Sequence, residues 1–203
     1  LMLEIGQKAS KCYSYTFYQR DSVLTADYKA GASQETITQH AQAYGNGNIS
    51  YQIFKNYPTG KVTTTDRLGT TNILCEEANE RPEWQLHPDT MTILSYACQK
   101  ATCRFKGRDY TTWYTMDVPV SEGPWKLHGL PGLIIKAEDS RGHFAFTCTG
   151  LEQLREAKPI LIHTKGREKL NRKELDKMYE RFYTDPIGFL AATSPNVTIN
   201  ITD

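Results

Sequence analysis

The chain has 203 residues, a formal net charge of +1, 39% hydrophobic residues and 23% charged residues. This length fits one domain with a substantial core, and the near-zero charge provides no field that would attract nucleic acid or an anionic membrane. The longest apolar runs, such as residues 133–135, fall far short of the roughly 20 residues that a membrane-spanning helix needs. We therefore expect a single domain over residues 1–203 that neither spans a membrane nor binds nucleic acid.

The N-terminal quarter contains two candidate strands with a polar stretch between them. Residues 11–20 alternate aromatic and polar side chains, with Tyr13, Tyr15 and Phe17 at a spacing of two. This spacing is typical of a half-buried strand. Residues 46–56 repeat the alternation, which predicts a second strand. The polar stretch over residues 30–44 fits either a short helix or a long loop.

The middle of the chain reads as a series of short strands. Residues 91–105 and 108–116 flank a turn at Lys106 and Gly107, which predicts a β-hairpin. Residues 142–149 follow the turn at residues 139–142, so we expect them to pair with residues 133–138. Four further short strands are expected at residues 61–66, 73–77, 83–86 and 160–164.

The one clear helix signal lies at residues 171–183. Asn171 followed by Glu174 is typical of a capping box, in which each side chain binds an otherwise unpaired amide. Four apolar residues then form a single stripe at helical spacing: Leu175, Met178, Tyr179 and Phe182. Asp185 and Pro186 end the helix. Residues 195–203 alternate again, which indicates a last strand or an ordered tail.

These elements predict a mainly β fold of the α+β class. The 12 tyrosines and many threonines favour strands. We expect a curved antiparallel sheet or half-barrel with the single C-terminal helix packed on it.

The five cysteines leave several states open. Their odd number means that at least one thiol is unpaired or pairs outside the chain. On one straight strand Cys98 and Cys103 would lie about 16 Å apart, too far for a disulfide unless the chain turns between them. The disulfide candidates are Cys75, Cys98, Cys103 and Cys148, and the alternative is that all are buried free thiols. No metal site is expected, because no second close pair of Cys or His residues is present.

A glycine-rich stretch at residues 123–139, GPWKLHGLPGLIIKAED, precedes an apolar run. A phosphate-binding loop would need a helix after its glycines, whereas a strand follows here. A type II turn explains the stretch better, with Pro131 at the second position and Gly132 at positive φ in the third. The turn would launch a buried strand and pack Trp125, Leu127 and Leu130 against the sheet.

Neither catalysis nor a cofactor is indicated by the residue pattern. No Gly-x-Ser-x-Gly motif is present, and we assign no catalytic residue. His128, His143 and Cys148 could meet if their strands pair, although scattered surface histidines account for the same pattern. An apolar pocket is the other candidate site. Its expected ligand-binding residues are Trp84, Trp113, Tyr114 and Trp125, which core packing would use equally well.

The glycine-rich stretch resembles the signature of the GLPGLI family, also called the Porphyromonas-type GLPGLI proteins. Six residues spell the motif: Gly129, Leu130, Pro131, Gly132, Leu133 and Ile134. Residues 93–125 look like the core of that family, and the resemblance is strong over roughly residues 80–150. It implies an envelope protein of Bacteroidetes whose signal peptide has been removed, in a family without an established activity. Leu1 in place of an initiator Met fits this expectation.

A second resemblance is to envelope proteins of the lipoprotein-localisation-factor type. Residues 96–101 together with Trp113 and Tyr114 are similar to their strand-and-hairpin pattern. Those proteins are incomplete antiparallel barrels that hold acyl chains beneath several helices. This chain shows only one clear helix, which departs from the pattern.

We therefore expect a periplasmic or outer-membrane-associated protein without catalysis, which binds an apolar ligand (a lipid or a peptide) or a protein partner. One alternative is an enzyme, such as a Cys- or His-based hydrolase. Another is an accessory partner of an outer-membrane receptor.

Overall fold

A computed structural model describes residues 1–44, 49–156 and 158–193 of the chain. These residues form two compact units. The first unit contains Leu1–Met2, Lys11–Ala78 and the segment that starts at Leu161, and the second contains Leu3–Ser10 and Asn79–Ile160. The expected single domain over residues 1–203 stays a prediction, because compact units need not fold independently.

The first unit is built on a sheet that the C-terminal part of the chain completes. Its strands run in the order β2 (Ser10–Tyr13), β3 (Gln52–Lys55), β4 (Lys61–Leu68), β5 (Thr71–Ala78) and β11 (Glu168–Leu170). Strands β3, β4 and β5 are antiparallel neighbours, whereas β11 runs parallel to β5. A short strand β1 (Met2–Ile5) precedes β2 in the chain. The expected strands at residues 61–66 and 73–77 are therefore confirmed.

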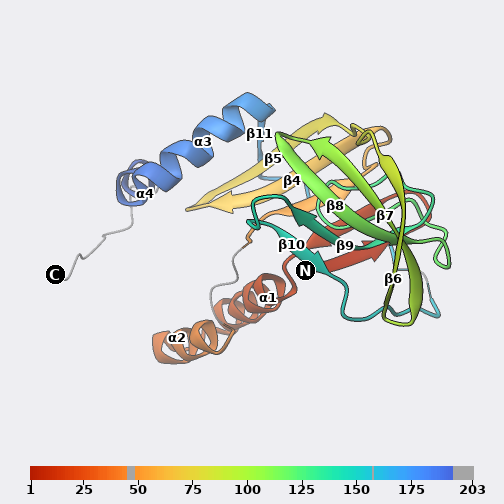
Figure 1. The fold of residues 1–203 in the computed structure, drawn as a ribbon. Helices are drawn as coiled ribbons and strands as arrows, with labels where there is room; N and C mark the ends of the chain where they lie inside the picture. The colour runs from red at the N-terminus through yellow and green to blue at the C-terminus, as the bar shows by residue number, and fades with distance from the viewer. Residues whose placement is uncertain (45–48, 157, 194–203) are drawn as a thin grey trace. The chain divides into compact units, whose positions relative to one another are not determined.

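Two helices occupy the segment between β2 and β3 (Figure 1). The strand expected over residues 11–20 is wrong beyond Tyr13, because α1 (Tyr15–Ala30) begins there. Ser14 caps this helix by accepting a hydrogen bond from the Phe17 amide, and Gly31 ends it at φ 66°. Helix α2 (Gln34–Ala43) confirms the helical alternative for residues 30–44. The second expected strand shortens to β3, and residues 45–48 lie outside the described residues.

The C-terminal helix forms as expected, and a further helix follows it. Helix α3 (Arg172–Thr184) carries the predicted capping box between Asn171 and Glu174. Helix α4 (Pro186–Thr193) starts at the proline that ends α3. The α3 stripe packs on apolar residues of β4 and β5, together with Phe189 of α4. The tail at residues 195–203, expected to be a strand or ordered, lies outside the described residues.

The second unit holds an antiparallel sheet of five strands. Their order is β10 (Ala145–Thr147), β9 (Leu133–Asp139), β8 (Arg108–Thr115), β7 (Tyr96–Phe105) and β6 (Gln85–Ile93). The hairpin around Lys106 and Gly107 is confirmed, as is the pairing of residues 142–149 with residues 133–138. The short strand expected over residues 160–164 is wrong, because β11 forms further along the chain.

The mainly β fold with antiparallel sheets is thus confirmed, with two corrections to its details. The strands form two sheets, and the described residues contain four helices where the sequence indicated one. None of the helices in the described part of the chain combines the length and apolar character that crossing a bilayer requires.

The two faces of the second unit's sheet pack different residues. One face, which we call face A, buries Ala101, Cys103, Tyr110, Tyr114 and Ala137. The other, face B, buries Cys98, Leu133 and Ile135, with Trp113 packed against them. Successive residues of a strand point to opposite faces, so Tyr114 and Trp113 take part in separate apolar clusters.

Candidate functional site

The glycine-rich stretch forms a loop between β8 and β9 that is packed onto face A. Leu127 and Leu130 are buried there, as the sequence predicts. Trp125 lies with its ring centroid 6.0 Å from that of Phe105 and 6.3 Å from that of Tyr110. The loop therefore contributes core residues to the sheet that it connects.

The expected type II turn at Pro131 and Gly132 is wrong, because Gly132 does not have the positive φ that this turn requires. In this loop positive φ angles occur at Gly129 (99°) and Trp125 (52°) and not at Gly132. A Cβ atom on Gly132 would lie 1.9 Å from the carbonyl oxygen of Thr115. Glycine is needed at position 132 because the backbone of β8 approaches too closely for any side chain.

A segment before β6 ties this loop in place through two side-chain donors. The Arg81 guanidinium donates a hydrogen bond to the carbonyl oxygen of Gly129. The Trp84 indole Nε1 donates to the carbonyl oxygen of His128 over 2.9 Å. Backbone carbonyls that a ligand could have used are therefore already bound within the protein, and the loop serves packing.

The four expected ligand-binding aromatics do not converge on one hollow. Trp84 and Trp125 pack against face A, and Tyr114 is almost fully buried there. The Tyr114 hydroxyl donates to the Gln99 side chain over 2.9 Å. Trp113 lies on face B. Their use as ligand-binding residues stays a prediction, and in this structure they fill the core.

A polar hollow lies on the second unit, and we call it the β7–β8 cleft. Its volume is about 350 Å³. It is lined by Glu83, Gln85, Thr102, Cys103, Arg104, Asp109, Tyr110, Thr111 and Ser140. Gln85, Thr102 and Thr111 are paired across β6, β7 and β8, so their side chains share one face. None of these positions shows a sequence spacing that predicts a site.

Charged and hydroxyl groups dominate the chemistry of the cleft. Arg104 and Asp109 form an exposed ion pair with an N–O distance of 3.4 Å, and such pairs contribute little to stability. Burial, together with the charge of Asp109, raises the pKa of the Cys103 thiol to about 12. Burial also raises the pKa of the Tyr110 phenol. A nucleophilic thiol needs a lowered pKa, so Cys103 is not suited to that role. The charged and hydroxyl side chains of the lining are suited to hydrogen bonding and ion pairing.

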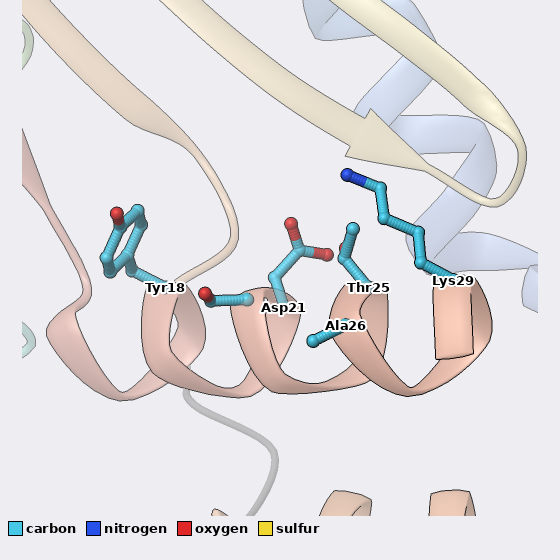
Figure 2. A pocket seen from close by; sticks show the side chains of 6 residues that line it. Tyr18, Asp21, Thr25, Ala26 and Lys29 are labelled. Atoms are coloured by element: carbon cyan, nitrogen blue, oxygen red, sulfur yellow. The ribbon is translucent and has the colours of Figure 1, made fainter. Parts of the chain in front are cut away.

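A second hollow, of about 370 Å³, runs along α1 in the first unit. Figure 2 shows Asp21, Thr25 and Lys29 projecting from the same side of this helix. Asp21 also forms an exposed ion pair with Arg67 at 3.3 Å. Every residue that lines the hollow belongs to α1, and no side chain of α1 is buried. It is therefore a surface along one helix and not an enclosed pocket.

The histidines and cysteine considered for catalysis have separate partners. The His143 ring contacts Arg108 at 3.2 Å, the Cys148 thiol donates to the carbonyl of Gly150, and the His128 ring contacts the carbonyl of Lys126. His128 precedes the start of β9 and His143 follows its end. None of the three contacts joins one of these side chains to another.

The cysteines of the second unit are free thiols in positions that disfavour pairing. Cys98 and Cys103 both lie on β7, so the separation of about 16 Å expected along one strand applies. Cys148 follows β10, three strands away from β7, which corresponds to about 14 Å along the sheet. Cys75 is buried beneath α3 in the first unit. Within the described residues no group of three or more His, Cys, Asp or Glu side chains is arranged to hold a metal ion.

Residues 105–136 match a family described as "Protein of unknown function (Porph_ging)". The matched segment contains β8, the glycine-rich loop and the first part of β9, and it supports a Porphyromonas-type family for this part of the chain. No curated protein matches the chain.

Two solved structures of PNGF-II, in space groups C2 and P21, share the fold. Their TM-scores are 0.55 and 0.58 at 15% and 13% identity, over 84% and 85% of this chain. The match covers 27% and 28% of those chains, so this chain spans about a quarter of their length. At this identity the likeness defines a fold class only: a mainly β domain that also occurs within a larger protein.

Proposed function

We propose that the protein is a non-catalytic binding module of the cell envelope and that the β7–β8 cleft docks a protein partner. The observation that supports this proposal is the polar lining of the cleft, with Arg104, Asp109 and Glu83 around paired threonines. Charged and hydroxyl side chains on a shallow sheet surface suit the polar groups of another protein. An accessory partner of an outer-membrane receptor is one specific form of this role.

Binding of an apolar ligand is the second form of the proposal, and it has less support. Pockets for such ligands are lined mainly by apolar side chains. Here Trp84, Tyr114 and Trp125 are packed into face A, and the cleft is polar. Native mass spectrometry of the purified protein would distinguish the two forms, because a co-purified lipid would favour the apolar ligand over the partner.

A Cys- or His-based hydrolase is the remaining alternative. The raised pKa values of the Cys98 and Cys103 thiols, both due first to burial, argue against either as a nucleophile.

We also propose that the protein belongs to the GLPGLI family of Bacteroidetes and lies in the periplasm or at the outer membrane, after removal of a signal peptide. The motif at residues 129–134, inside the segment that matches the family profile, supports this placement.

The partner role can be tested by capture from an envelope extract with three immobilised baits. The first is the unchanged protein, and the second is a cleft variant, Thr102→Arg with Thr111→Arg. The control carries Thr149→Arg, at an exposed position outside the cleft. The proposal predicts that the unchanged and control baits capture the same protein from the extract. The cleft variant is expected not to capture it. Equal capture by all three baits, or no specific capture, would contradict it.

A further inference from the structure

Among the described residues, β6 is an edge strand of the second unit's sheet. It is the last strand in the order of that sheet, while the opposite edge is the three-residue β10. Most of its nine residues are exposed. A long exposed edge offers backbone groups to another strand, and proteins usually protect such edges with charges, bulges or proline. The bulge between Leu86 and Thr90, which includes Pro88, protects only the first half of β6, and this leaves residues 90–93 open.

The hairpin turn determines which backbone groups of this open half point outward. Leu94 and Ser95, at φ 50° and 68°, form a two-residue turn that joins β6 to β7. In such a turn the flanking residues Ile93 and Tyr96 exchange both hydrogen bonds, and alternate pairs along the ladder repeat this pattern. The amide and carbonyl groups of Thr90 and Thr92 therefore face away from β7.

Exposed apolar side chains accompany these outward-facing groups. Met91 is 38% exposed and Leu94 is 40% exposed. A leucine at positive φ is unfavourable, because Gly or Asn would adopt this conformation at lower energy. A bulky apolar side chain in this unfavourable conformation indicates a function for the side chain, such as a contact with a partner.

We propose that β6 pairs with β6 of a second copy of this chain, in antiparallel register about Met91. In this register Thr90 of one copy lies opposite Thr92 of the other, and the two residues exchange their outward hydrogen bonds on both sides of a two-fold axis. Met91 meets its own counterpart on face B, and Leu94, just beyond the paired residues, comes beside the bulged residues 87–89 of the second copy. The two five-strand sheets become one continuous sheet.

A second copy fits this edge better than an unrelated strand because the edge is self-complementary. The open half, residues 90–93, contains no charged residue, so two copies can pair along it without placing like charges opposite one another. The interface is nevertheless small, since an edge of this length buries less than the roughly 1,000 Å² typical of stable complexes. The dimer therefore forms in a concentration-dependent equilibrium with the monomer.

Sedimentation velocity of the full chain, over a concentration series from low to several hundred micromolar, tests this pairing. The unchanged protein and the control Thr92→Ala, which keeps the amide, are expected to shift from monomer to dimer. Thr92→Pro removes one outward N–H without removing a bond to β7, because proline is tolerated at an edge, and it is expected to stay monomeric. A monomeric unchanged protein at every concentration, or equal dimerisation of Thr92→Pro, would overturn the proposal. So would assembly beyond the dimer, because the two-fold contact closes on itself.

A charge exchange at Met91 tests the register itself and does not depend on the proline variant. Met91→Lys and Met91→Glu each place like charges directly opposite one another across the two-fold axis, so each alone is expected to be monomeric. An equimolar mixture is expected to form a mixed dimer. If the mixture stays monomeric while the unchanged protein dimerises, the pairing about Met91 is wrong. Circular dichroism of each variant confirms that the sheet is retained.

Discussion

The glycine-rich loop and the β6–β7 hairpin turn both reverse the chain in the second unit, but different forces determine their residues. The loop is buried against face A, and its Gly132 is required by the backbone of Thr115. The hairpin turn is exposed and uses Leu94 and Ser95 at positive φ, where glycine would be favoured. Packing thus selects the residues of the loop, whereas local backbone energy alone does not explain the residues of the turn.

The family match covers one of these two regions. The match over residues 105–136 includes the whole loop and begins after the hairpin turn at Leu94 and Ser95. A packed loop requires particular residues at particular positions. An exposed turn can vary unless a partner contacts it.

The largest expected effect is that of Gly132→Ala. The new Cβ would overlap the carbonyl oxygen of Thr115, a backbone atom that cannot rotate away. We expect a loss of at least about 3 kcal/mol of unfolding free energy, the upper end of the range for overpacking. Urea denaturation followed by tryptophan fluorescence measures it, because all three tryptophans lie in the second unit. Gly150→Ala is the control, since nothing lies near its Cβ position, and an equal effect in both variants would show that the loop is not tightly packed.

Removing one of the two donors that tie the loop should have a smaller effect. Trp84→Phe keeps an aromatic ring but loses the hydrogen bond to the carbonyl of His128. We expect a loss of about 1–2 kcal/mol in the same urea experiment, as is usual when a partly buried acceptor loses its donor. A variant as stable as the unchanged protein would mean that this hydrogen bond does not hold the loop.

The hairpin turn should respond in the opposite direction. Replacing Leu94 and Ser95 by Asn and Gly installs the preferred residues of this turn type. We expect a gain of about 1 kcal/mol in stability, from relief of the left-handed conformation. The same variant should dimerise less, because it lacks the Leu94 side chain. A loss of stability would show that Leu94 already makes favourable contacts within the monomer.

The turn between β9 and β10 provides a pH-dependent case. Burial alone would raise the pKa of Asp139, but hydrogen bonds from the Phe144 amide, Arg108 and the His143 backbone hold it below its usual value. Because the pKa is lower in the folded state, ionised Asp139 stabilises the protein at pH values above its unfolded-state pKa of about 4. This stabilisation is lost as the pH falls through the folded-state pKa. The stability difference between the unchanged protein and Asp139→Asn should therefore be largest at neutral pH and shrink at acidic pH. Urea midpoints across this range measure it, and a constant difference would contradict the lowered pKa.

The smallest expected effect is a difference in labelling rate between the partly exposed and the buried cysteines of the second unit. Cys148 is partly exposed, whereas Cys98 and Cys103 are buried on β7. In the native protein we expect an alkylating reagent at mildly alkaline pH to modify Cys148 first, with peptide mass spectrometry as the measurement. At least three thiols should react after denaturation without a reductant. Early modification of Cys98, which pairs with Met91, would show that the hairpin opens more readily than its contacts suggest.

Local signals in the sequence predict the elements that depend on local interactions. The capping box of α3 and the hairpin at Gly107 are both correct, because each depends on residues close together in the chain. Helix α1 was missed because the spacing of Tyr13, Tyr15 and Phe17 imitates a strand. Ser14 and Gly31, which bound a segment free of proline and glycine, were the available signal.

Features that depend on distant residues could not be predicted. The need for glycine at position 132 arises from the approach of Thr115 in another strand. The β7–β8 cleft combines residues from the segment before β6 and from three strands. No periodicity connects such positions, so only the folded sheet brings them together.

The parallel pairing of β11 with β5 has a consequence for synthesis on the ribosome. Lys169 pairs with Leu74, and the strands of the other sheet are all encoded between these two residues. A nascent chain that has emerged as far as residue 160 therefore carries every strand of the second unit's sheet. It still lacks β11 and α3, so the apolar face of β4 and β5 stays uncovered until the last part of the chain is released.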